Sequence, residues 1–370
     1  MVKVINNSTP IEDGFFMPAE YEPQDRIYMI WPERKDNWRK DALPAQEAYK
    51  EVAFAISEFT PVTMLANFKE YEHARKMLEP KVRVVEMPSN DAWCRDSGPT
   101  VLVNGSGQRR GCDWRFNAWG GLVDGLYNPW DEDDEIAKNI CRLEDIEYYS
   151  LDNFVLEGGS IHVDGIGTVL TTEMCLLSAG RNPHLSKMEI EQILKDYLGA
   201  TKVLWLKRGI DPMETNGHID DVACFVRPGE VACIYTEDVN NPFYEVAMDN
   251  YRTLCNMTDC RGEQFTVHKI CLPKNPVYLK GAETIEDVPG TIPRKDGDIC
   301  IASYLNFLIT NDGVIVPQYG DENDELALRQ LEEIFPDKKI VGVFTKEIVY
   351  GGGNIHCITQ QIPSPRYNSL

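Results

Sequence analysis

The chain has 370 residues, 43% of them hydrophobic, and a formal net charge of −22. This length and composition can bury a large core, as one big domain or two ordinary ones. The negative charge argues against a nucleic-acid partner and suits a small cationic substrate, and no run approaches the roughly 20 apolar residues of a membrane span.

Two features of the sequence predict a cytoplasmic protein. Residues 1–10 lack the charged and apolar regions of a signal peptide. The 11 cysteines are scattered and form no CxxC pair. This pattern argues against a disulfide scaffold and a structural zinc site, and it fits a reducing compartment.

A hairpin, then a helix, then a strand recurs along the chain. Asn-Gly and Asp-Gly pairs favour hairpins because these residues tolerate positive φ. Predicted hairpins turn at Asn104, Asp164, Pro228 and Asp312, each followed by glycine. Helices are predicted next at 131–143, 186–199, 241–254 and 324–335, and strands at 202–206, 265–272 and 339–344. Before the first hairpin, a helical face spans 49–59 and a strand spans 62–65.

These segments make five units, of which the first and the last are partial and complete each other. Copies of one unit that close on themselves form a propeller-like ring with one shared core. We therefore expect an α/β fold in which residues 1–370 form a single domain of five ββαβ units around a central site. Ring closure predicts that strand 355–362 lies beside strand 27–31, because closure removes an exposed edge. An α/β sandwich in two halves is the alternative.

Polar motifs occupy equivalent places in successive units. They span residues 91–98, 156–160, 216–221 and 351–357. Equivalent ends of units in a ring converge on its axis. One pocket is therefore predicted to hold the side chains of Asp96, Glu157, His218, Asp220 and Cys357. Singly, each could be a turn, capping or buried structural residue; their matched positions favour a shared site.

Cys357 comes shortly after a run of three glycines, residues 351–353. Glycine lets the backbone approach a ligand because it has no Cβ, so the thiol is placed as a nucleophile would be. The alternative is a small buried hydrophobe. With His218 and carboxylates, a thiol suits attack on a cationic electrophile such as a guanidinium, which carboxylates bind in bidentate fashion. His218 could then protonate departing ammonia and activate the hydrolytic water.

Three further residues could bind such a substrate. The indole faces of Trp93 and Trp119 attract cations and pack against methylene chains, although both tryptophans could equally be core residues. Glu214 is a further acid, placed shortly before His218 on the same segment.

As a set, the motifs resemble those of the agmatine deiminases, which belong to the guanidino-group-modifying (pentein) superfamily. They are Trp93-Cys-Arg-Asp96-Ser-Gly-Pro99, Glu157-Gly-Gly159, Gly217-His218-Ile-Asp220 and Gly351-Gly-Gly-Asn354-Ile-His-Cys357, with further matches in Asp13 to Glu20 and Trp31-Pro32. The resemblance implies a five-bladed α/β propeller with pseudo-fivefold symmetry. It also implies hydrolysis of agmatine to N-carbamoylputrescine and ammonia in polyamine metabolism, with no metal or cofactor. Family members often form homo-oligomers.

The same resemblance implies a role for each residue at the reacting end. Cys357 would carry a covalent amidino intermediate, and His218 would be the general acid and base. Asp96 and Asp220 would hold the guanidinium. Glu157 would orient His218 and the reacting end.

The far end of the substrate separates the alternatives. In an agmatine deiminase, Glu214 would help to bind the terminal amine. An arginine deiminase or peptidyl-arginine deiminase binds a carboxylate or a peptide backbone, usually with arginines at the mouth, and Arg95 and Arg181 could be misread as such arginines. A non-catalytic cation-binding protein would bind agmatine without releasing ammonia. A papain-like hydrolase is disfavoured, because it needs an oxyanion hole and places its Cys before its His.

Overall fold

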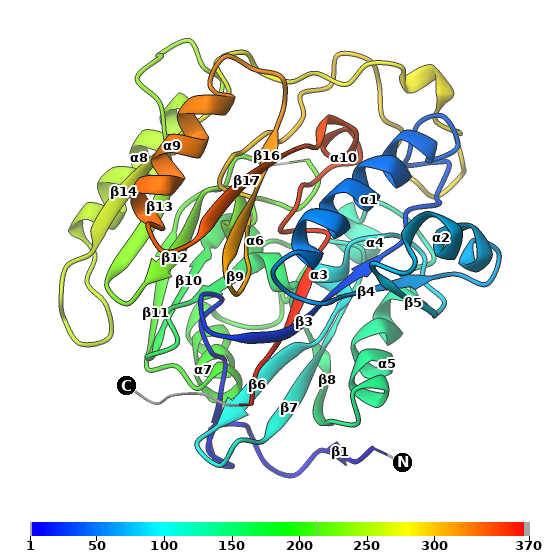
Figure 1. The fold of residues 1–370 in the computed structure, drawn as a ribbon. Helices are drawn as coiled ribbons and strands as arrows, with labels where there is room; N and C mark the ends of the chain where they lie inside the picture. Colours follow the sequence, from blue (N-terminus) through cyan, green and yellow to red (C-terminus); the bar gives the residue numbers. More distant parts are fainter. Residues whose placement is uncertain (1, 212, 366–370) are drawn as a thin grey trace.

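In the part of the chain that the structure describes, the strands form five sheets rather than the two halves of a sandwich (Figure 1). The computed structural model describes residues 2–211 and 213–365. Within them, no helix is both long and apolar enough to cross a lipid bilayer.

Four of the sheets repeat the predicted ββαβ order, in which a helix joins an antiparallel hairpin to a strand parallel with it. The hairpins are β6 (Thr100–Asn104) with β7 (Arg109–Arg115), β9 (Ile161–Val163) with β10 (Thr168–Thr172), β12 (Ala223–Arg227) with β13 (Glu230–Tyr235), and β15 (Leu308–Ile309) with β16 (Gly313–Gln318). The helices are α5 (Ile136–Leu143), α7 (Lys187–Leu198), α8 (Tyr244–Asn256) and α9 (Asp324–Ile334). The parallel strands are β8 (Glu147–Val155), β11 (Lys202–Leu206), β14 (Thr266–Cys271) and β17 (Lys339–Phe344). Two short strands, β1 (Val4–Ile5) and β2 (Phe15–Phe16), extend the first sheet.

The fifth sheet is built from opposite ends of the chain, and it confirms the predicted pairing. β18 (Gln360–Pro363) runs antiparallel to β3 (Gln24–Ile30), with Gln361 opposite Ile27. Helix α1 (Leu43–Ser57) leads from β3 to the parallel strand β4 (Val62–Ala66), and α2 (Tyr71–Leu78) leads on to β5 (Arg83–Glu86). The red end of the chain therefore completes the blue unit in Figure 1.

Local sequence signals account for most of the elements. A capping box of Ser186 and Glu189 forms at the start of α7, and Gly199 ends that helix at φ 67°. That conformation suits glycine, which has no Cβ to clash.

Several boundaries differ from the prediction, and three of these differences have a local cause. The last strand begins at Gln360 rather than Ile355, because residues 355–358 form a turn that holds the nucleophile segment. Helix α1 begins at Leu43, where Pro44 suits the first turn. The acidic stretch before α5 is a short 3-10 turn, because the carboxylate of Asp133 accepts hydrogen bonds from the backbone of the preceding motif. Strand β8 was not predicted at all.

The repeat brings the polar motifs together. Short helical turns precede the hairpins: α3 (Cys94–Ser97) before β6, η2 (Gly158–Ser160) before β9, and η3 (Ile219–Asp221) before β12. Segment 351–359 precedes β18 in the same way. α3 packs on η2, and η2 packs on η3. The backbone N–H of Arg95 donates to the carbonyl of Cys357, 3.1 Å away. Motifs far apart in sequence therefore meet at one place.

The pairing of β18 with β3 can be tested by stability. Ile362 is fully buried in the core behind this sheet. Ile362→Ala should lower the free energy of unfolding by about 2–5 kcal/mol, because it leaves a cavity. The matched control Ile11→Ala, at a side chain that is 45% exposed, should cost under about 1 kcal/mol. Urea unfolding measures both, and equal losses would contradict a buried closing strand.

Candidate active site

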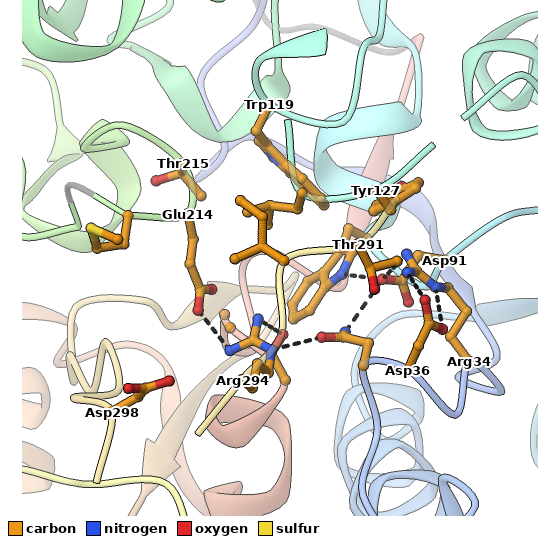
Figure 2. Close-up of a pocket in the computed structure, with 18 of the residues that line it drawn as sticks. Arg34, Asp36, Asp91, Trp119, Tyr127, Glu214, Thr215, Thr291, Arg294 and Asp298 are labelled. Carbon is orange, nitrogen blue, oxygen red and sulfur yellow. Dashed lines mark hydrogen bonds and ion pairs between the residues drawn. The ribbon is translucent and has the colours of Figure 1, made fainter. Parts of the chain in front are cut away.

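The predicted site residues converge around one cavity of about 440 Å³ (Figure 2). Five of them line its wall: Trp93, Asp96, Trp119, Glu214 and Cys357. The remaining three lie buried behind that wall: Glu157, His218 and Asp220.

Asp96 is held at the wall by two donors. The indole Nε1 of Trp119 donates to Asp96 Oδ2 at 2.8 Å, and the backbone N–H of Gly159 donates to Oδ1 at 2.9 Å. Burial raises the pKa of Asp96, and the neighbouring carboxylates of Asp220 and Glu157 add to this against the opposing effect of His218. The Asp96 carboxylate is therefore fixed in position, but the positive charge around it is too small to offset its burial and its acidic neighbours.

The ring of His218 is surrounded by carboxylates. Its Nδ1 lies 3.9 Å from Asp96 and 4.0 Å from Asp220, and its Nε2 lies 3.6 Å from Glu157. Burial alone lowers the pKa of this histidine, but Asp96, and then the side chains of Cys175 and Glu157, outweigh it, so the pKa stands well above its ordinary value. The surroundings of His218 therefore favour its imidazolium form, which can act as an acid.

The thiol of Cys357 lies among groups that keep it neutral. Its Sγ is 3.6 Å from Asp220 Oδ2 and 3.2 Å from the donating side-chain nitrogen of Asn306. Burial raises the pKa of the thiol well above its ordinary value, and the carboxylates of Asp220, Asp221 and Asp96 raise it further. The free protein therefore holds a thiol, and a nearby cation is needed to make it a thiolate.

Two glycines make this close packing possible, as the glycine-rich motifs predict. A Cβ on Gly159 would lie 2.6 Å from His218 Nδ1 and 2.9 Å from Asp96 Oδ1. A Cβ on Gly353 would lie 2.5 Å from the Trp93 ring and 3.0 Å from the Cβ of Cys357. Any side chain at either position would push the site apart.

Glu157 is held by a buried arginine. Arg181 Nε lies 2.8 Å from Glu157 Oε1, and the same guanidinium donates to the carbonyl oxygens of Trp119 and Thr215. Burial raises the pKa of Glu157, but Arg181 and His218 outweigh it and lower the pKa. Glu157 therefore stays ionised beside the imidazolium of His218.

The two arginines considered for a carboxylate-binding mouth are both buried away from the cavity. Arg181 pairs with Glu157, and Arg95 pairs with Glu20 at 3.1 Å. Neither lines the cavity wall. Arg95 and Arg181 are therefore not placed to bind a substrate carboxylate in this cavity, which agrees with the expectation that such an interpretation would be a misreading.

Arg294, a basic residue that was not identified from the sequence, also reaches the cavity. Arg294 Nη1 lies 2.6 Å from Glu214 Oε1, and Figure 2 shows the two side chains pointing toward each other. Arg294 also donates to Asn37 Oδ1 at 2.9 Å and to the carbonyl of Gly351 at 2.7 Å. Glu214 thus faces the cavity, as expected, but it already has a cationic partner.

Trp93 and Trp119 are both core residues and cavity-lining residues, the two alternatives left open by the sequence. Both are buried in the core, at 5% and 3% exposure, yet both line the cavity. Trp93 stacks on Trp38 with ring centroids 5.3 Å apart, and its Nε1 donates to Asp91 at 3.1 Å. These contacts fix the indoles as rigid walls.

Besides Arg294, two residues that contact the predicted catalytic residues were not identified from the sequence. Asn306 comes just before β15, the position in its unit that the polar motifs occupy in the others. That equivalence could have revealed it. His356 stands beside Cys357 in the quoted motif, and its Nδ1 lies 2.8 Å from Asp220 Oδ2. No local signal points to that contact.

Comparison with known proteins finds similarity over almost the whole chain. Residues 16–363 match the family model of the Porphyromonas-type peptidyl-arginine deiminases. An agmatine deiminase of Pseudomonas putida is 49% identical over 97% of this chain and 98% of its own length. The structure of an agmatine deiminase of Enterococcus faecalis superposes with a TM-score of 0.97 at 63% identity, covering 98% of this chain and 100% of the other.

The neutral state of the Cys357 thiol predicts a distinctive pH dependence of alkylation. Because only the thiolate reacts, the rate of iodoacetamide labelling at Cys357 should keep rising with pH beyond the ordinary thiol range near about 8.5. Peptide mass spectrometry at each pH measures the rate. Cys357→Ser gives the background from the other cysteines, and circular dichroism checks folding. A rate that levels off below the ordinary range would contradict a raised pKa.

Proposed function

The chain belongs to the family of the Porphyromonas-type peptidyl-arginine deiminases, and we propose that within it this protein is an agmatine deiminase. It hydrolyses the C–N bond of a linear amidine, converting agmatine and water to N-carbamoylputrescine and ammonia. One observation carries the proposal: a buried thiol and an imidazolium share one set of carboxylates at a cavity wall, with Cys357 Sγ 3.6 Å from Asp220.

Asp96 and Asp220 bind the guanidinium. Asp96 lies 5% exposed at the cavity wall and Asp220 lies 2% exposed behind it. In such buried places a planar cation with fixed donors gains charge-assisted hydrogen bonds. The raised pKa of Asp96 reflects a shortage of positive charge, which the substrate supplies. Trp93 and Trp119 flank the cation and its methylene chain.

The bound cation also activates the nucleophile. A positive charge next to Cys357 lowers the pKa of the thiol, which loses its proton to solvent. The thiolate attacks the central guanidinium carbon, and a C–S bond forms. The imidazolium of His218 then protonates a terminal nitrogen, the C–N bond breaks, and ammonia leaves. An amidino group remains on Cys357.

Hydrolysis reverses these roles. His218, now neutral, takes a proton from water while the oxygen attacks the amidino carbon. The C–S bond breaks, the departing thiolate takes up the remaining proton of the added hydroxyl, and the ureido group of N-carbamoylputrescine is left. Glu157 is a positioning residue here, because Arg181 holds it against His218 at 3.6 Å.

Glu214 binds the terminal ammonium at the far end of the cavity. Its partner Arg294 must therefore yield or share that carboxylate when agmatine binds. Arg294 is also the observation that makes an arginine deiminase the second candidate. If its guanidinium were released from Glu214, it could donate hydrogen bonds to a substrate carboxylate. The turnover of the two substrates decides between them.

Further properties belong to the same proposal. Residues 1–370 form a single catalytic domain whose five sheets are the blades of a pentein propeller. The enzyme needs no metal or cofactor, binds neither nucleic acid nor membrane, and works in the cytoplasm as a homo-oligomer. The sheet repeat supports the single domain, the acidic composition argues against a nucleic-acid partner, and the other points rest on the resemblance to the agmatine deiminases.

The assay that tests the function compares agmatine with free arginine. The wild type should release ammonia from agmatine with a kcat/KM at least about 100-fold above that for arginine. Cys357→Ser should release none from either but still bind agmatine, because a hydroxyl cannot replace the thiolate. Mass spectrometry of trapped enzyme should find the adduct on Cys357 alone. Agmatine binding without ammonia release by the wild type would mean a cation-binding protein instead.

The two guanidinium-binding carboxylates can be tested by removing charge alone. Asp96→Asn and Asp220→Asn should each lower kcat/KM for agmatine by an amount equivalent to about 3–5 kcal/mol, because each removes a buried charge from a buried cation. The matched control is Asp249→Asn, at a carboxylate that is 57% exposed and pairs with Arg208; it should change kcat/KM by less than about 1 kcal/mol. A site variant that keeps most of its activity would make that carboxylate structural.

A further inference from the structure

A second set of charged groups lies buried behind the site and takes no part in the steps above. His356 is at its centre. Its Nδ1 lies 2.8 Å from Asp220 Oδ2, and its Nε2 lies 2.9 Å and 3.0 Å from the two oxygens of Glu20. Glu20 in turn pairs with Arg95 at 3.1 Å and with His162 at 3.6 Å. None of these side chains is more than 5% exposed.

The ring of His356 must be an imidazolium to satisfy this geometry. Both ring nitrogens face carboxylates, and a neutral imidazole has a single N–H to donate. Burial and the nearby Arg95 lower the pKa of His356, but Glu20 and Asp220 outweigh them and raise it. The ring therefore donates in two directions, forward to Asp220 and backward to Glu20.

The contact fixes one particular oxygen of Asp220. Oδ2, which accepts from His356, also lies 3.6 Å from Cys357 Sγ. The other oxygen, Oδ1, is buried and has no hydrogen-bond partner among residues 2–211 and 213–365. The carboxylate is thus anchored on one side, while its second oxygen is left for an incoming donor.

The backbone locks His356 and the nucleophile together. Asn306 Oδ1 accepts from the N–H groups of both His356 and Cys357, at 2.9 Å and 3.3 Å. Arg95 Nε donates to the carbonyl of His356 at 3.3 Å. A displacement of the imidazolium would therefore move the thiol as well.

We propose that His356 is a positioning residue for Asp220, with its imidazolium anchoring one carboxylate oxygen and Glu20 serving as the counter-anion. The inference rests on the proposed function, in which Asp220 receives the substrate guanidinium. It assigns a role to a histidine that touches neither substrate nor reacting atoms, and it separates His356 from the acid–base residue His218.

The inference predicts how pH dependence changes when the imidazolium is removed. His356 holds the pKa of Asp220 below its ordinary value against burial, with help from His218 and Arg95. Without His356, the pKa of Asp220 rises, so its charge is lost at a higher pH. The acid limb of kcat/KM should therefore move upward. The other titratable groups that face this network are Glu20, Arg95, His162, Cys224, Asp96, Asp221 and Cys357.

Two substitutions separate the contact of His356 with Asp220 from its contact with Glu20. In His356→Asn the amide nitrogen takes the place of Nδ1 and keeps a neutral donor to Asp220. In His356→Gln it takes the place of Nε2 and keeps only the contact to Glu20. We expect kcat/KM for agmatine to fall about tenfold in the first and about 100-fold in the second, with an upward shift of the acid limb in both. His268→Gln is the matched control, since His268 pairs with Glu230 at 2.6 Å outside the site; it should leave the profile unchanged.

An observation on the resting enzyme completes the test. Nitrogen-15 NMR of labelled wild type should show His356 with both ring nitrogens protonated at neutral pH, a signal that His356→Asn lacks. A neutral ring, or equal losses in the two variants with an unmoved acid limb, would overturn the inference while leaving the proposed function intact. A wild type that releases no ammonia from agmatine would instead reject the proposed function. If the variants misfold, the ring signal alone decides.

Discussion

The antiparallel pairing of β18 with β3 joins the two ends of the chain, and the position of Cys357 depends on it. The segment that carries the thiol lies between α10 (Lys346–Tyr350) and β18. It is anchored after the thiol by this pairing and before it by Gly351, whose Cα lies against the ring of Trp38. Trp38, and Arg95, whose backbone N–H donates to the carbonyl of Cys357, both lie in the first third of the chain. A nucleophile near the C-terminus can therefore meet carboxylates from the other units only because the first unit is completed by the last.

At the reacting end of the cavity and behind it, the pKa of a buried carboxylate follows from the cations that face it. Glu157 faces Arg181, Glu20 faces His356 and Arg95, and Asp220 faces His356, and the pKa of each of the three carboxylates is lowered. Asp96 and Asp221 have weaker compensation, so their pKa values rise, as does that of the Cys357 thiol. The folded protein therefore pairs the charges behind the cavity and leaves the wall at Asp96 and Cys357 short of positive charge. A guanidinium supplies that charge at the place where chemistry is needed.

The sequence predicted the repeat well because its signals are local. Turn pairs, a capping box and helical periodicity place hairpins and helices without knowledge of distant partners. Strand β8 escaped because its residues mix polar and apolar side chains, and its parallel pairing with β7 is set across an intervening helix. Asn306 is uncharged and has no glycine beside it, so nothing in the local sequence marked it as a site residue. The partners of His356 and Glu214 lie on distant segments, and Arg294 lies in a stretch without regular structure, so no spacing rule could reveal those ion pairs.

The cavity is assembled from two kinds of structure with different freedom to change. Its reacting end is made by turns that precede hairpin strands, so those residues are tied to the sheets. Much of its mouth, residues 291–295 together with Asp298 and Ile299, comes from the long irregular connection between β14 and β15. Irregular connections accept substitutions and changes of length far more readily than paired strands do. During evolution, substitutions in this one surface connection can change which guanidino compound the cavity accepts. The residues that break the C–N bond can stay the same.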